Sequence, residues 1–223
     1  MYREDECFDT PEGLVTFARW FIWERIRSLE NDVNACLNPS SRYQPAPFAA
    51  VLSCFAVIDL LGSLLTGEIE KTSKNIKKFL TKYMSYKEDV AELMTNVYRH
   101  KLVHQHQPTI IYKYKDKYVS WQIWNVKHPL HKELVPLRVE WKPYDFYPKY
   151  IPLPKILKEL SEQLKKQGPI QILIISIPKM LEEIKEGAEK YLNELQSSDP
   201  ESDLRHCFCK ALRKMLYRET QNY

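Results

Sequence analysis

Glycine is scarce in this chain, at 5 of 223 residues. Loops that cradle phosphates depend on closely spaced glycines, so this scarcity argues against glycine-loop chemistry. Cysteine is also sparse, and its odd count of 5 does not resemble a disulfide framework. Cys36 and Cys54 fall within apolar helical patterns, where a free thiol packs as a small hydrophobe. We therefore expect a cytoplasmic protein without a disulfide framework.

Membrane and export signals are lacking as well. Residues 1–6 are mostly acidic and polar, unlike the start of a secretory signal. One apolar run, residues 48–65, approaches membrane length, but it contains Asp59. An acid at the bilayer centre costs about 2.5–3.5 kcal/mol on insertion scales. A buried core helix is therefore a better interpretation than a transmembrane span, and we expect no membrane partner.

Charge is plentiful but nearly balanced, with 33 Lys and Arg against 29 Asp and Glu and a net charge of +4. This mild positive charge is compatible with RNA as a partner and does not require it. Apolar residues make up 44% of the chain, which is ordinary for a globular protein. A single domain of this length buries about 70% of its unfolded surface. We therefore expect no structural metal and no cofactor.

Helices dominate the N-terminal half of the sequence. Thr10 and Pro11 form a helix start, and apolar residues then recur with a 3.6-residue period. Gly67 and Pro108 mark later helix ends. Together these signals predict four helices, at residues 11–37, 47–66, 69–84 and 87–106.

The pattern changes after residue 108. Aromatic and β-branched residues flank a polar turn, which predicts a β-hairpin over residues 109–126 and a third strand at 134–141. Helices then return, at residues 153–166, 170–195 with an interruption at Pro178, and 201–219. The predicted fold is a mainly α helical bundle with a small inserted hairpin or three-stranded sheet and C-terminal helices. Within this single domain the predicted parts are 1–108, 109–150 and 151–223.

Histidine is concentrated near the end of the fourth predicted helix, where His100, His104 and His106 accompany Arg99 and Lys101. An Arg followed by a polar residue, with a His about five residues on, resembles the motif of the HEPN family of ribonucleases. That family carries the motif near a helix end in an all-α bundle, which matches the predicted context. The resemblance covers this motif and the four-helix half, while the hairpin and the C-terminal third lie outside it.

The resemblance implies metal-independent RNA cleavage or RNA binding, in defence or toxin–antitoxin roles. It assigns acid–base chemistry to His104, the phosphate contact to Arg99 and polar support to His100, with Lys101 and His106 as weaker binding residues. The side chains suit these roles, because imidazole titrates near pH 6.5 and a guanidinium grips two phosphate oxygens. The family's nucleophile is the RNA 2′-hydroxyl, and its product is a cyclic phosphate.

The spacing of the motif raises a geometric problem. On a straight α-helix, residues five apart point about 140° away from each other, so Arg99 and His104 do not converge. A distorted helix end solves this, and so does a dimer in which each protomer supplies one motif. HEPN proteins commonly use the second solution, so the resemblance implies a homodimer.

Two alternatives accompany this interpretation. The basic helix end is also what a solvated, non-catalytic helical interaction domain presents, since cations stabilise a helix C-terminus. His100 and His104 have the spacing of a helical zinc pair, and His206 with Cys209 supplies two further ligand types. Two inert thiols and a surface His explain the latter pair better, and we favour that interpretation.

Two further features have two interpretations each. Asp59 is a lone acid among apolar residues, and it either pairs with the basic fourth helix or faces a groove. The hairpin alternates Tyr and Lys over residues 112–118, a pattern that suits stacking on single-stranded RNA. The same alternation is expected when the rings of a two-faced sheet cover helices, and we favour this second interpretation.

Overall fold

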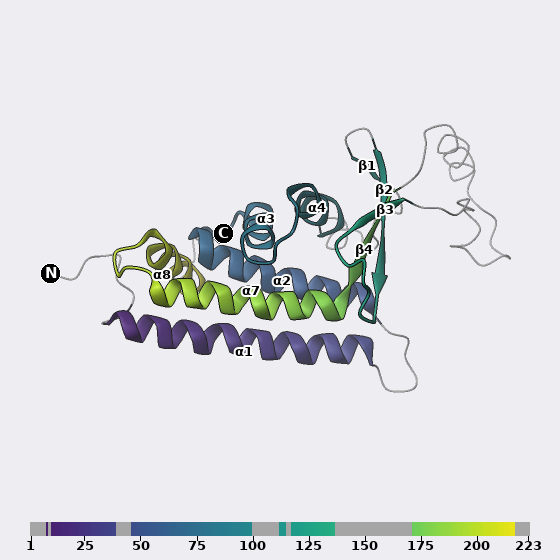
Figure 1. The fold of residues 1–223 in the computed structure, drawn as a ribbon. Coiled ribbons are helices and arrows are strands. Elements are labelled where there is room, and N and C mark those ends of the chain that lie inside the picture. The colour runs from purple at the N-terminus through teal and green to yellow at the C-terminus, as the bar shows by residue number, and fades with distance from the viewer. Residues whose placement is uncertain are drawn as a thin grey trace, which may run out of the picture.

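The structure is a computed structural model that describes residue 8 and residues 10–38, 46–99, 112–114, 117–136 and 171–216. The predicted helix at 153–166, the end of the predicted third strand and the residues after Arg99 in the motif lie outside this range. The described chain is mainly helical with a small four-stranded sheet, which confirms the predicted fold class. In Figure 1 the helices lie side by side and the sheet stands at one end of them.

The first helix, α1 (Pro11–Leu37), has the predicted bounds. The Thr10 hydroxyl accepts a hydrogen bond from the Gly13 amide at 3.0 Å, and Pro11 occupies the first turn. One stripe of the helix is buried and recurs every three or four positions, at Leu14, Ala18, Ile22, Ile26, Leu29 and Val33.

The second helix, α2 (Pro47–Thr66), is the core helix that its composition predicts. It packs against α1, α3, α7 and α8, and Gly67 ends it in the left-handed conformation at φ 71°. By length and composition this helix alone among the described residues is able to cross a membrane. Its packing against four other helices is that of a protein core.

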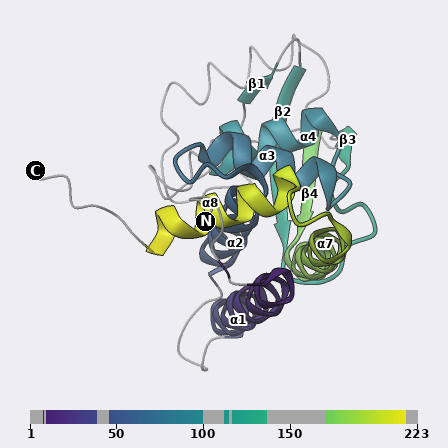
Figure 2. The same ribbon diagram turned by 90° about the vertical axis from the view of Figure 1, so that its left-hand side faces the viewer.

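Two shorter helices, α3 (Thr72–Lys82) and α4 (Glu88–Leu93), follow on the same side of α2. The prediction extended α3 to 69–84, which is too long by a few residues at each end. Gly62 of α2 is needed at the crossing, because a Cβ there would overlap the backbone carbonyl of Asn75 on α3. In Figures 1 and 2, α3 lies above α2 between α4 and α8.

The sheet has the strand order β1-β2-β4-β3. β1 (Tyr112–Tyr114) and β2 (Lys117–Trp124) form the predicted hairpin, and β3 (Leu134–Pro136) begins where the third strand was expected. β4 (Gln171–Ser176) pairs parallel with β2 and antiparallel with β3. The sheet therefore includes a strand from beyond residue 150, which was assigned to C-terminal helices.

The prediction of a helix over 170–195 interrupted at Pro178 is confirmed for residues 177–195, but it is wrong for residues 171–176 and for the interruption. Residues up to Ser176 form β4, and Pro178 lies in the first turn of the next helix, α7 (Ile177–Ser197), where a missing amide hydrogen is tolerated. Ser176 caps this helix by accepting a hydrogen bond from the Lys179 amide at 3.5 Å.

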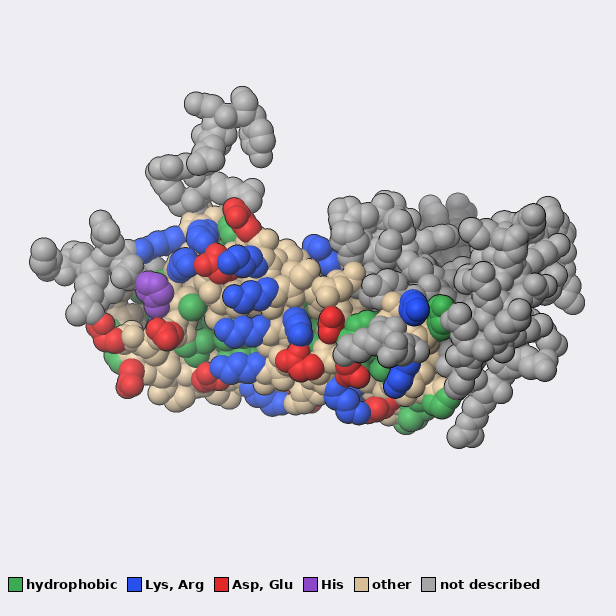
Figure 3. All heavy atoms as spheres, turned by 90° about the horizontal axis from the view of Figure 1, so that it is seen from above, with side chains coloured by type: hydrophobic (Ala, Val, Ile, Leu, Met, Phe, Trp, Pro, Cys, Tyr) green, Lys and Arg blue, Asp and Glu red, His purple; other side chains and the backbone are tan. Residues whose placement is uncertain are grey.

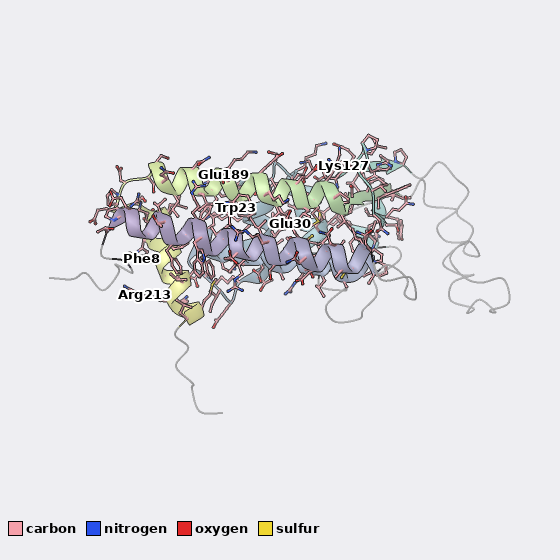
Figure 4. The ribbon with its side chains drawn as sticks, turned by 90° about the horizontal axis from the view of Figure 1, so that it is seen from below. Phe8, Trp23, Glu30, Lys127, Glu189 and Arg213 are labelled. Atoms are coloured by element: carbon pink, nitrogen blue, oxygen red, sulfur yellow. The ribbon has the colours of Figure 1, made fainter. Side chains whose placement is uncertain are left out.

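The C-terminal helices close the bundle. α7 lies along α1, and two ion pairs, Arg19 with Glu189 and Lys185 with Glu30, bridge them (Figure 4). The last helix, α8 (Asp203–Leu216), packs on α2. The helical core is thus formed by α2, with α1 and α7 on one side and α3, α4 and α8 on the other.

Candidate functional site

Arg99 is the only residue of the HEPN-like motif within the described part of the chain. His100, Lys101, His104 and His106 lie outside it. The Arg99 side chain is half-buried at the end of the element that follows α4. The site is therefore built from Arg99 and from the residues that surround it.

The segment that ends at Arg99 is a π-helix, η1 (Met94–Arg99), where the sequence predicted an uninterrupted α-helix. At its start the Met94 amide is shared between the carbonyls of Ala91 and Val90. The buried Thr95 hydroxyl donates to the Ala91 carbonyl at 2.6 Å and so competes for the same helical acceptor. π-helical turns are rare and occur frequently at functional sites, because they redirect the side chains that follow them.

Asp59 of α2 lies near Arg99 and belongs to a hydrogen-bonded group around Asn75. The Asn75 side chain is fully buried, and its amide donates to the Ser63 hydroxyl at 2.9 Å and to the Glu68 carbonyl at 2.6 Å. A longer contact of 3.5 Å reaches a carboxylate oxygen of Asp59. Asn75 therefore fixes the position of Asp59 relative to α3.

The charge of Asp59 responds to this environment. Burial raises the pKa of Asp59 above its usual range, and the Thr72 hydroxyl, the Asn75 amide and the Arg99 guanidinium oppose that rise. The Arg99 charge is the smallest of these influences, and the hydrogen bonds that act on the Asp59 carboxyl come from Thr72 and Asn75 of α3. Pairing of Asp59 with the fourth-helix region stays a prediction.

No known protein family, characterised protein or solved structure matches this chain. Its chemistry must therefore be inferred from its own residues.

A basic surface flanks the site on α3 and α8. Lys71, Lys74 and Lys78 are exposed on one stripe of α3, and none of them has an ion-pair partner among the described residues. On α8 a pocket of about 340 Å³ is lined by His206, Lys210, Arg213 and Lys214. Figure 3 shows Lys and Arg side chains gathered over this face. We call these seven residues the α3/α8 basic face.

Glu68 ties the two halves of this face together. It lies between α2 and α3 and accepts hydrogen bonds from Lys210 at 2.7 Å and Lys214 at 3.2 Å. These bonds lower the pKa of Glu68 to about 2, so the carboxylate stays ionised. Lys78 and Lys210 both lie close enough to Cys207 to oppose the rise that burial causes in its pKa, which places the α3 stripe beside α8.

Sequence reasoning missed a second polar cluster, built around the buried His131. Its Nδ1 accepts a hydrogen bond from the Ser176 amide at 2.9 Å, so its other ring nitrogen carries the hydrogen. That Nε2 lies 3.2 Å from Glu183 and 3.1 Å from the Tyr86 hydroxyl. Lys132 donates to the other oxygen of Glu183 at 2.7 Å. These residues come from four separate segments of the chain, so no local sequence pattern predicts the cluster.

The cysteines give no support to the alternative of a shared zinc site. Cys209 is disulfide-bonded, contrary to the expectation of free thiols, and a disulfide sulfur does not supply the thiolate that zinc binds. His206 lines the basic pocket. Within the described ranges, no group of three or more His, Cys, Asp or Glu side chains is arranged to hold a metal ion.

One ring of the hairpin, Tyr114, is turned toward the helices. Tyr114 is half-buried, and its hydroxyl donates to Glu92 of α4 at 2.7 Å. Val119 at the centre of β2 is buried, while Lys113 and Lys117 are exposed. At Tyr114 this favours the interpretation that the sheet covers helices over the interpretation of a stacking platform for RNA.

Proposed function

We propose that this protein acts on RNA in the manner of HEPN-like proteins, as a metal-independent endoribonuclease or RNA-binding protein. Arg99 binds the scissile phosphate, His104 moves the proton and His100 gives polar support. The observation that carries the proposal is the π-helix that ends at Arg99 beside Asp59.

The π-helix bears on the geometric problem of the motif. Its hydrogen bonds join residues five positions apart, and its wider turn directs such residues closer to one face than an α-helix does. This winding ends at Arg99 and so precedes the interval to His104. It supports the proposal only in that the helix leading into the motif is not a straight α-helix. The proposal includes a homodimer as a second route to the same convergence, and light scattering that detects only a 26.6 kDa species contradicts that part.

Asp59 gives Arg99 the support that a phosphate-binding arginine needs. A nearby carboxylate orients a guanidinium and offsets part of its charge while the site is empty. An incoming phosphate brings the negative charge that a bidentate guanidinium matches best. Asp59 is thus a positioning residue for Arg99.

The test is cleavage of single-stranded RNA in excess chelator. His104→Ala removes proton transfer, which is typically worth about 10²–10⁴-fold in rate. Arg99→Ala removes electrostatic stabilisation worth about 10²–10³-fold. The matched control is His128→Ala, a half-buried histidine by the sheet, which leaves the rate unchanged. Cleavage at the wild-type rate in His104→Ala sinks the assignment, because the activity then does not depend on the proposed acid–base residue. Loss of cleavage in His104→Ala but not in His128→Ala excludes a contaminating nuclease as its source.

A second candidate function is a non-catalytic helical interaction domain. It is favoured by the aromatic group on α1, where Trp20 is 59% exposed and contacts Phe17, which stacks on Phe21. Exposed aromatic groups are typical of protein interfaces. An absence of cleavage by wild-type protein, together with a partner that is lost in Trp20→Ala, favours this candidate.

A further inference from the structure

Three lysines of the α3/α8 basic face carry positive charge that no described ion pair uses. Two other lysines of α3 are paired, Lys77 with Glu88 and Lys82 with Glu194. Lys71, Lys74 and Lys78 are exposed and have no ion-pair partner among the described residues. Like charges placed close together on one surface repel, so they cost stability unless a ligand neutralises them.

The face continues onto α8 and is held in shape there. His206, Lys210 and Lys214 recur every four residues and so share one side of the helix, with Arg213 beside them. Gly67 lets α8 approach closely, because a Cβ at this position would lie 3.1 Å from the Lys210 side chain. Ion pairs with Glu68 hold the ends of Lys210 and Lys214 in place, so these two cations are ordered before any ligand binds.

We propose that the α3/α8 basic face binds the phosphate backbone of single-stranded RNA and that the pocket on α8 holds one phosphate. Rows of Lys and Arg neutralise successive phosphates and release their counterions, which makes such binding independent of base sequence. Glu68 is an acid beside this face, and it is already paired with Lys210 and Lys214. The choice of RNA as the polyanion rests on the proposed function.

The position of the face also fits this role. α3 lies between α8 and α4 (Figures 1 and 2), and η1, which follows α4 and ends at Arg99, also contacts α3. A strand that crosses α3 from the α8 pocket therefore runs toward the α4–η1 segment. An anionic membrane is a poorer match, because the apolar residues of α3, Ile76, Phe79 and Leu80, are all buried in the core. Helices that bind membrane surfaces instead expose such residues for insertion.

The binding test uses a fluorescein-labelled 2′-O-methyl oligonucleotide. This probe keeps the phosphates but lacks the free 2′-hydroxyl, so the proposed cleavage does not consume it. The variant Lys74→Gln/Lys78→Gln/Arg213→Gln removes three cations from the face. We expect about tenfold weaker binding at moderate salt and a slope of log K against log salt that is shallower by about 2, since each contact to a single strand contributes about 0.7.

The matched control removes three cations elsewhere, in Arg27→Gln/Lys127→Gln/Lys190→Gln, on the side of α1 and α7 (Figure 4). Both triple variants lose three positive charges. If binding depends on the α3/α8 basic face, only the first variant loses affinity for the probe. Thermal melts show whether both variants fold, and Lys74→Gln/Lys78→Gln alone repeats the test without changing α8.

The outcomes separate this inference from the proposed function. Equal affinity of the two triple variants, or wild-type protein that does not bind the probe, overturns the basic face as an RNA surface. Binding to phosphatidylserine vesicles without binding to the probe also overturns it, in favour of a membrane surface. Loss of cleavage in His104→Ala with unchanged probe binding is the expected result. If wild-type protein cleaves no RNA but binds the probe through this face, only the catalytic proposal fails.

Discussion

Single buried polar side chains connect the core of this protein with its candidate site. Asn75 uses both ends of its amide, since its oxygen also accepts a hydrogen bond from the Thr66 hydroxyl at 2.7 Å. Every described contact of this side chain is made to α2 or to the turn after it. Burial of an amide is stabilising only when its hydrogen bonds are made, so Asn75 determines how α3 sits on α2 and where the Asp59 carboxyl lies.

Tyr191 of α7 shows the opposite situation and leads to a prediction. Its side chain is fully buried, and within the described residues its hydroxyl has no hydrogen-bond partner. An unpaired buried hydroxyl costs about 1–3 kcal/mol, so Tyr191→Phe should raise the free energy of unfolding by roughly 1 kcal/mol. Denaturant unfolding of both proteins measures this difference.

The neighbouring Tyr83 provides the matched control for that prediction. It stacks edge-on against Tyr191, but its hydroxyl donates to Glu194 at 2.9 Å. Burial and this bond to a carboxylate both raise the pKa of Tyr83. Tyr83→Phe should therefore destabilise the protein. Equal effects of the two substitutions would show that the Tyr191 hydroxyl is satisfied after all.

At the level of elements, the sequence was informative where local chemistry determines structure. The capping threonine, the prolines at helix starts and Gly67 set the bounds of α1 and α2, and these predictions are confirmed. β4 was mistaken for helix because a short apolar run such as residues 172–175 has no distinguishing period. Its parallel pairing with β2 joins strands about 50 residues apart in the sequence. No local sequence signal predicts such a distant partner.

The candidate site was predictable only in part, for similar reasons. Arg99 and Asp59 stand out because each is an unusual residue for its local pattern. The π-helix was not predicted, since the apolar spacing of residues 87–106 fits an uninterrupted α-helix and no local pattern distinguishes π winding from it. The α3/α8 basic face and the His131 cluster depend on which elements the fold brings together, so only the structure reveals them.

The close approach of α2 and α3 leads to an element-level prediction. Replacing Gly with Ala inside a helix normally stabilises it by up to about 1 kcal/mol. At Gly62 the new methyl group would overlap the Asn75 backbone, and overpacking of this kind costs about 1–3 kcal/mol. Gly62→Ala should therefore lower the free energy of unfolding by roughly 1–2 kcal/mol, measured by urea denaturation.

Ser53→Ala, at a half-buried position of the same helix, is the control and should change stability by less than about 0.5 kcal/mol. Because the Gly62 contact also fixes Asn75, the Ala variant should also displace the Asp59 carboxyl that Asn75 holds. A Gly62→Ala protein with wild-type stability would mean that α3 shifts freely on α2.

For the whole molecule, the His131 cluster is the junction between the sheet and the helices. Tyr86 comes from the segment between α3 and α4, Ser176 from the end of β4 and Glu183 from α7. Two residues beside the cluster, Ser85 and Lys132, have positive φ angles of 56° and 59°. Such conformations are costly for residues other than Gly, so the hydrogen bonds of the cluster must offset the strain.

Because of this junction, we expect the free energy of unfolding to depend on pH. Burial alone would raise the pKa of Glu183, but hydrogen bonds from His131 and Lys132 outweigh it and leave the pKa below its usual range. Near pH 4 the folded protein therefore binds fewer protons at Glu183 than the unfolded chain does. Its contribution to stability is present above the ordinary Glu pKa of about 4.3 and is lost as the pH falls through the lower folded value.

Glu183→Gln isolates this contribution, because glutamine has a similar size and does not titrate. The variant should be less stable than wild type at pH 7, and the difference should shrink as the pH is lowered from 5 to 3, measured by urea denaturation at each pH. Glu182→Gln, an exposed neighbour paired with Lys127, serves as the control and should follow the wild-type profile closely. If the difference in free energy of unfolding between Glu183→Gln and wild type stays constant across this pH range, Glu183 acts through its shape and hydrogen bonds. Its charge then does not hold the sheet to the helices.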